Sequence, residues 1–159
     1  MNHKGAENGQ ELLTYQRERF QGLMEELVDC CQMRTAYLAR QFATSQAEMR
    51  ALLLFSGERY LTAKSIAAAL DVSKSRVTKI IESLIKKGLV QRVPDPADAR
   101  VKLISLTQEG ETRMESIAQV NSELHLNVLT DLEPEERKQV LRSLELLRAG
   151  MEVAKTRML

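Results

Sequence analysis

The sequence predicts a mainly α-helical fold that carries one small β-hairpin. Apolar residues recur at spacings of three and four along most of the 159-residue chain, and N-capping residues divide these stretches into separate helices. One stretch near the middle, residues 88–107, instead holds two short runs of strand-forming residues around a loop with two Pro. With 43% hydrophobic residues the chain can bury one core, which suits a single domain.

The N-terminal third predicts a short tail and one long helix. Residues 1–10 are polar, contain two Gly and are expected to form a disordered tail. Residues 12–40 have helical periodicity. The apolar surface of this helix is broad and must be covered, and it consists of Phe20, Leu23, Met24, Leu27, Val28, Cys31 and Met33. A second helix starts after Ser45, because Ser45 and Glu48 have the spacing of a capping box.

A short helix, a tight turn and a longer helix follow. Thr62 is placed to cap a helix that runs to Leu70, and Asp71 is able to adopt the left-handed conformation that a tight turn requires. Ser73 then caps a helix that extends to Lys87. The buried stripe of this helix consists of Val77, Ile80, Ile81 and Leu84. A helix-turn-helix of this kind is typical of DNA-binding proteins.

A hairpin comes directly after the longer helix. Gly88 supplies a left-handed end to that helix, and residues 89–93 form a short strand. The loop at residues 94–98 interrupts the strand, and Lys102–Leu106 forms the return strand before Thr107 caps the next helix. Together with the two preceding helices, this hairpin predicts a winged helix-turn-helix core.

The last third predicts two more helices, one from Thr107 to about Val128 and one that starts at Pro134. The apolar stripe of the last helix consists of Val140, Leu141, Leu144, Leu147 and Met151. The middle of the chain alone would leave the terminal stripes in water. Two chains that pair through the first, fifth and sixth helices would bury them.

The run from Leu61 to Gly110 resembles the winged-helix core of the MarR family of bacterial and archaeal transcription regulators, above all in Asp98-Ala99-Arg100 followed by Leu106-Thr107. The flanking helices match the family's dimerisation elements, so the resemblance extends over about residues 11–157. It implies a homodimer with dimerisation helices in residues 11–44 and 111–159 around a DNA-binding core at 45–110. Family members often have two adjacent Arg after the wing Asp; here Ala99 takes the first place, so one positive charge of the wing is missing.

Charge also points to double-stranded DNA as the partner. Residues 58–110 have a formal net charge of +4 and the remainder −3, although the whole chain has only +1. The expected DNA-binding residues are Thr62, Lys64, Ser73, Lys74, Ser75, Arg76, Thr78, Lys79 and Arg100. Arg76 and Lys79 are expected at base edges in the major groove and Arg100 in the minor groove, with the residues at helix starts on phosphates. Alternatively, Thr62 and Ser73 only cap helices, Lys64 is merely solvated and Arg100 only pairs with Asp98.

The resemblance further implies a small anionic or phenolic effector in a cleft between the dimer region and the winged helix. The candidate lining residues are Met33, Tyr37, Phe42, Met49 and Leu53, and the alternative for each is an ordinary place in the core or hinge. Adjacent Cys30 and Cys31 suggest a thiol sensor instead, although Cys is among the most commonly buried residues. The peroxide-sensing branch of the family places its reactive Cys nearer the start of this helix.

The composition and motifs of the sequence do not support other classes of protein. Aromatic residues make up 4% and Trp is absent, which argues against a stacking platform for single-stranded nucleic acid. The chain has no Gly-rich phosphate loop, no His close to a nucleophile and no metal-binding spacing, so we expect no catalytic, cofactor or metal site. Without a membrane-length apolar run or a signal-peptide core, a cytoplasmic location and no membrane partner are expected.

The sequence therefore predicts a sequence-specific transcriptional regulator that binds a palindromic operator as a homodimer. A twofold dimer would present two recognition helices roughly 34 Å apart to successive major grooves. We expect a repressor that a small-molecule ligand releases from DNA. The alternatives are a winged helix that serves as a protein-docking module and a thiol-based redox-sensing regulator that uses Cys30 and Cys31.

Overall fold

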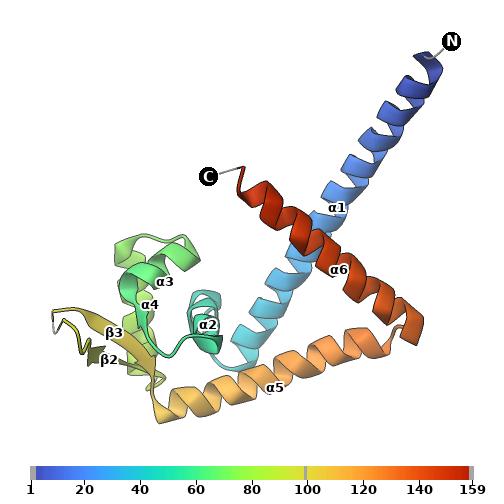
Figure 1. Ribbon diagram of the computed structural model, residues 1–159. Coiled ribbons are helices and arrows are strands. Elements are labelled where there is room, and N and C mark those ends of the chain that lie inside the picture. Colours follow the sequence, from blue (N-terminus) through green and yellow to red (C-terminus); the bar gives the residue numbers. More distant parts are fainter. Residues whose placement is uncertain (1–2, 99, 158–159) are drawn as a thin grey trace. The chain divides into compact units, whose positions relative to one another are not determined.

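The computed structural model describes residues 3–98 and 100–157, with side chains from residue 9 onward. In chain order the elements are α1 (His3–Gln41), α2 (Gln46–Leu53), the 3-10 helix η1 (Leu54–Ser56), β1 (Leu61–Thr62), α3 (Ala63–Leu70), α4 (Lys74–Lys86), β2 (Val90–Pro94), β3 (Lys102–Leu106), α5 (Gln108–Thr130) and α6 (Pro134–Lys155) (Figure 1). This mainly helical fold with a small antiparallel sheet confirms the predicted class. Ala99 of the wing motif and the outermost residues of the predicted terminal segments lie outside the described residues.

The described chain forms two compact units that divide between Glu115 and Ser116. The first unit holds α1 to the start of α5. Its core lies where α4 packs against α2 and α3, which Figure 1 shows gathered beside the β2–β3 hairpin. The predicted α4 stripe is confirmed as buried, and Met49 and Leu52 of α2 are also buried. The core therefore fixes which side of α4 remains outside.

The predicted helix starts are confirmed in detail. The Ser45 hydroxyl accepts a hydrogen bond from the Glu48 amide at 3.2 Å, and Thr62 and Ser73 accept from the amides three residues later. Asp71 has the left-handed conformation expected of the turn, with φ 53°, and Gly88 has φ 70°. Side-chain acceptors at these positions satisfy amide groups that a helix start otherwise leaves unpaired.

The sheet contains a third strand that the sequence analysis did not predict. Its order is β1-β3-β2, with Leu61 opposite Ile104 and Val90 opposite Leu106 in antiparallel pairs. Because β1 ends at Thr62, the residue that caps α3, the outer edge of the sheet leads straight into the helix-turn-helix. The hairpin is thus hydrogen-bonded to the segment that begins α3.

The first turn of α5 lies tightly against the end of α4. The Thr107 amide donates to the Leu89 carbonyl at 3.1 Å, and the Thr107 hydroxyl accepts from the Gly110 amide at 3.0 Å. A Cβ at position 110 would collide with the Leu89 carbonyl group, so only Gly fits there.

The first helix is longer than expected. Residues 3–10, which the sequence analysis predicted as a disordered tail, continue α1 without a break. The two Gly in this stretch cost roughly 1 kcal/mol each in a helix interior, but no Pro interrupts it, and adding a residue to an existing helix is far easier than starting one.

The second unit holds α5 from Ser116 and the whole of α6. Glu133 precedes α6, its amide donates to the Glu136 carboxylate at 2.9 Å, and Pro134 occupies the first turn as predicted. Arg137 also donates from Nε to the Leu132 carbonyl at 2.8 Å. These bonds define the turn between the two helices.

A buried carboxylate, Glu48, connects α2 to α4. Its side chain is 6% exposed and forms an ion pair with Lys87, from Nζ to Oε2 at 2.8 Å. The Ser83 hydroxyl donates to Oε1 of Glu48 at 2.5 Å, and the Ser45 amide donates to Oε2 at 2.6 Å. Burial raises the pKa of Glu48, but these hydrogen bonds outweigh it and lower the pKa from 4.5 to about 2.

Glu48→Gln should therefore remove stability that depends on pH. Because the folded-state pKa lies below the unfolded value, ionised Glu48 stabilises the fold fully above pH 4.5, and this contribution is lost as the pH falls toward about 2. The difference in unfolding free energy between the wild type and Glu48→Gln should shrink by on the order of 3 kcal/mol over that window. Urea titrations at fixed protein concentration and several pH values measure it.

The matched control is Glu18→Gln, since the Glu18 side chain is 67% exposed on α1. Its difference from the wild type should stay near zero at every pH. A Glu48→Gln difference that does not change with pH would contradict the ionised, paired state of Glu48.

Candidate nucleic-acid interface

The turn between α3 and α4 leaves the first two turns of α4 accessible. Asp71 ends α3, and the Val72 amide bonds back to the Ala67 carbonyl at 3.1 Å. Ser73 then caps α4, and Lys74, Ser75, Arg76 and Lys79 are all exposed, whereas Thr78 is half-buried with its hydroxyl on the Lys74 carbonyl at 2.9 Å. The structure therefore brings most of the predicted recognition residues together on the open side of one helix.

These residues divide between two faces of α4. Positions that differ by three, four and seven share a face of a helix. Ser75 and Lys79 lie opposite the buried stripe, together with Glu82 and Lys86, which are also exposed. Glu82 and Lys86 were not among the predicted DNA-binding residues, although the same helical periodicity places them on this face.

Arg76 lies on the flank of α4 that faces the start of α2. An open hollow of about 530 Å³ is found here, and its lining residues are Ser45, Glu48, Arg76, Lys79, Ile80, Ser83 and Lys87. Lys87 is already paired with Glu48, so Arg76 and Lys79 supply the uncompensated positive charge of this hollow. The arrangement suits an anionic group beside the recognition helix.

The predicted phosphate-binding residues lie at the starts of α3 and α4. Thr62 and Ser73 both cap their helices, as predicted. The Ser73 hydroxyl also lies 3.0 Å from the Ser75 hydroxyl. Lys64 and Lys74 are exposed in the first turns of α3 and α4. Amide groups and cations at a helix start favour a phosphate in the same place.

Arg100 lies in the loop between β2 and β3, and its side chain is 91% exposed. Its Nε donates to Asp98 Oδ1 at 3.1 Å and its backbone amide donates to the same oxygen at 3.0 Å. These two bonds lower the pKa of Asp98. The predicted alternative, pairing with Asp98, is thus present, and it holds the guanidinium at the wing tip. Arg92 and Lys102, which the sequence analysis did not select, are exposed on the strands of the wing.

The five candidate effector residues occupy different environments. Met49 is fully buried in the core, Met33 is 64% exposed and Tyr37 42% exposed, and Phe42 and Leu53 are half-buried. A hollow of about 630 Å³ does lie between α1 and α2, but its lining is Met24, Leu27, Val28, Cys31, Gln32, Thr35, Gln46 and Arg50. The structure therefore does not bring the predicted set together in this hollow.

Both Cys residues are exposed on α1, and Cys31 lines the hollow between α1 and α2. Among the described residues, His, Cys, Asp and Glu nowhere gather in a group of three that could hold a metal ion. Within residues 3–98 and 100–157, no helix combines the length and apolar character needed to cross a lipid bilayer.

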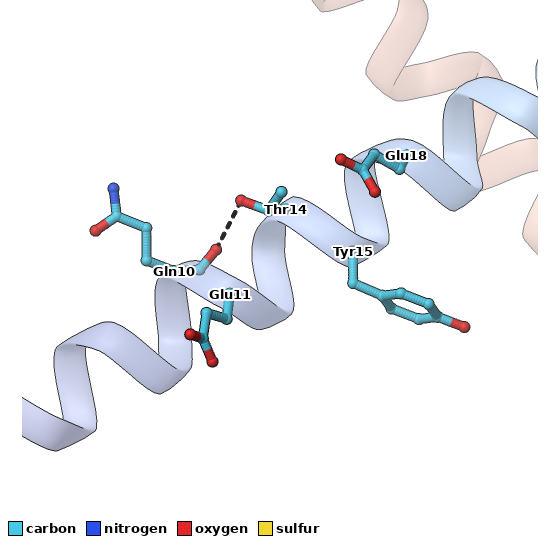
Figure 2. Close-up of a pocket in the computed structure, with 5 residues that line it drawn as sticks. All are labelled: Gln10, Glu11, Thr14, Tyr15 and Glu18. Carbon is cyan, nitrogen blue, oxygen red and sulfur yellow. Dashed lines mark hydrogen bonds between the residues drawn. The ribbon is translucent and has the colours of Figure 1, made fainter.

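A further hollow, of about 510 Å³, lies on the N-terminal half of α1. Figure 2 shows its five lining residues, Gln10, Glu11, Thr14, Tyr15 and Glu18, on a single helix, with the Thr14 hydroxyl bonded to the Gln10 carbonyl at 2.9 Å. One helix cannot enclose a ligand. All five side chains are exposed, so this surface is an exposed helix face.

Comparison with known proteins agrees with this geometry. The family model described as MarR family matches residues 44–101, from the linker before α2 to the wing loop. The uncharacterised helix-turn-helix regulator YdgJ of Bacillus subtilis is 26% identical over 97 residues, which cover 61% of this chain and 59% of YdgJ. The chain thus spans about three fifths of this relative.

Solved structures share the fold. A mutant form of MepR from Staphylococcus aureus has a TM-score of 0.72 at 22% identity and covers 83% of this chain and 98% of that one. A complex of S. aureus MepR with DNA has a TM-score of 0.62 at 22% identity, with 82% and 98% covered. The matched family model coincides with the α2-to-wing segment whose caps, turn and strands the structure confirms, so this segment of the chain is similar to the MarR family.

Proposed function

We propose that this protein is a sequence-specific, double-stranded DNA-binding transcriptional regulator, a repressor that binds a palindromic operator as a homodimer. The observation that carries the proposal is the exposed start of α4, where Ser75, Arg76 and Lys79 project from a helix whose other side is fixed in the core. A helix held in this way fits the major groove, with its first turns toward the base edges. The MepR–DNA complex, which shares the fold, supports this use.

The exposed residues of α3, α4 and the wing are proposed to contact different parts of the DNA. Arg76 and Lys79, with Ser75 and Thr78 beside them, are proposed to face base edges, whereas Thr62, Lys64, Ser73 and Lys74 would hold phosphates at helix starts. Arg100 would enter the minor groove, because guanidinium is the cation best suited to a narrow groove. A site on chromosomal DNA also implies a cytoplasmic location.

Exposed apolar residues support the dimer. On α1, Phe20, Leu23, Leu27 and Val28 are exposed, and on α6 the same holds for Val140, Leu141, Leu144 and Met151. Such stripes on separate long helices exceed what a lone chain ordinarily leaves in water. Pairing of two chains through α1, α5 and α6 would cover them and set the two α4 helices in a twofold arrangement.

For release from DNA we propose a small anionic or phenolic effector. The hollow between α1 and α2, with Arg50 among its lining residues, offers room and a cation for such a molecule. A thiol-based redox regulator is the second candidate function, because Cys30 and Cys31 are both exposed. Peroxide treatment in the DNA-binding assay, compared with addition of benzoate, distinguishes the two.

The proposal predicts that the protein selects one palindromic sequence from a library of random duplexes. Arg76→Ala should weaken binding to that operator by about 1–3 kcal/mol and relax the base preference at one position in each half-site. Lys74→Ala should weaken binding to all sequences alike and lower the salt slope by roughly one. Fluorescence anisotropy at several salt concentrations measures both. A protein-docking winged helix would select no sequence.

A second prediction concerns the wing. Arg100→Ala should weaken operator binding and abolish a preference for A·T over G·C flanks, because the narrow minor groove of A·T tracts concentrates negative potential. Arg100→Lys should restore only part of the affinity, since an ammonium group is more strongly hydrated than guanidinium. Thermal unfolding serves as the control and should not change. If Arg100→Ala keeps the preference for A·T flanks, Arg100 has no role in the minor groove.

A third prediction concerns assembly. Leu144→Glu should dissociate the dimer, because Leu144 belongs to the α6 stripe at the spacing of Val140, Leu147 and Met151. The matched control is Leu146→Glu: Leu146 is 67% exposed but lies off that stripe, so this variant should remain dimeric. Sedimentation velocity separates the two outcomes. Equal behaviour of the two variants would mean that the α6 stripe is not the dimer contact.

A further inference from the structure

The linker between α1 and α2 has an unusual backbone. Ala43 adopts the left-handed conformation, with φ 52°, which costs a residue other than Gly roughly 1–2 kcal/mol. The Thr44 amide bonds back to the Ala39 carbonyl at 2.9 Å, and the Ser45 amide bonds forward to the Glu48 carboxylate at 2.6 Å. The linker is therefore a defined turn, and groups outside it must help to hold its shape.

Two cations from distant parts of the chain bind consecutive carbonyl groups of this turn. Lys87, just after α4, donates from Nζ to the Ala43 carbonyl at 2.9 Å and also pairs with Glu48. Arg113, in the second turn of α5, donates from Nη1 to the Phe42 carbonyl at 3.2 Å. Lys87 is 44 residues and Arg113 is 71 residues away from its acceptor. We call Phe42–Ser45 with Lys87 and Arg113 the linker clamp.

We propose that Lys87 and Arg113 are positioning residues that set the distance between the two recognition helices of the dimer, and hence the half-site spacing of the operator. This inference rests on the proposed function. The linker clamp joins the end of the recognition helix to α1 and to α5, which are two of the three proposed dimerisation helices. Neither cation needs to touch DNA for this role. Each holds a carbonyl group of the turn through which α4 is tied to the end of α1.

Binding to two half-sites demands a fixed separation, because each added base pair moves the second half-site along the axis and turns it by about a tenth of a helical turn. A rigid connection would therefore confine binding to one spacing. Loss of one clamp contact would let each winged helix shift relative to its α1. The loss of affinity caused by an altered half-site spacing should then become smaller, while affinity for a single half-site should not change.

The test uses the full-length protein and the duplex that the wild type selects from a random library, together with versions whose half-sites are one base pair closer or farther apart. For Lys87→Met and for Arg113→Met, the ratio of affinities between the original and altered spacings should fall about fivefold or more relative to the wild type. Each variant should bind a duplex with a single half-site as the wild type does.

Three control variants test whether a changed dependence on spacing arises from lost positioning and not from lost charge or lost stability. Lys86→Met removes a cation from the same end of α4, and Glu109→Gln removes the carboxylate that pairs with Arg113 at 3.4 Å without removing its bond to the linker. Ile81→Val lowers stability from within the core, because Ile81 is 2% exposed. All three controls should keep the wild-type dependence on spacing.

If Lys87→Met does not fold because Glu48 loses its partner, Arg113→Met carries the test alone, since Arg113 lies outside that ion pair. Unchanged spacing ratios in the folded clamp variants would overturn the inference while leaving the proposed function intact. The inference would also be overturned, with the proposed function intact, if those variants lost affinity equally for every duplex. If the wild type selects no sequence at all, the proposed function itself has failed.

Discussion

The carboxylate of Glu48 is the constraint on which the rest of the winged helix depends. A buried charge is costly unless its oxygens are fully hydrogen-bonded, so Glu48 requires its donors in fixed places. Lys87 and Ser83 supply them from the end of α4, and the Ser45 amide supplies another from the cap of α2. The side of α4 left in solvent is therefore determined by apolar packing at one end and by an ionised group at the other.

The two ends of α4 have different surroundings as a result. Its first turns are open, and their side chains can adapt to a partner. Its last turn is tied to α2, to the linker before α2 and, through Leu89 and Thr107, to α5. Rigidity is thus concentrated away from the surface that is proposed to meet DNA, which is how binding residues are best held in place.

Local rules predicted most of the fold. These rules predicted the capping residues, the left-handed conformations of Asp71 and Gly88 and the buried stripe of α4. Each of these features depends only on residues close by in the sequence. Features that depend on contacts between distant residues could not be predicted from the sequence. The strand β1 has only two residues and no alternation, so only its pairing with β3 reveals it.

The candidate site divides in the same way. The exposure of Lys74, Ser75 and Lys79 follows from helical periodicity. The two distant partners of Glu48, Ser83 and Lys87, lie 35 and 39 residues away and could not be identified from spacing. The five candidate effector residues do not line the hollow between α1 and α2, because the position of such a hollow depends on how the two helices pack. The backbone of β3 is paired on both sides, with β1 and β2, so its register is fixed independently of the loop at residues 95–101. Evolution can therefore lengthen, shorten or exchange that loop as a module, and so change the reach of the wing, without moving the recognition helix.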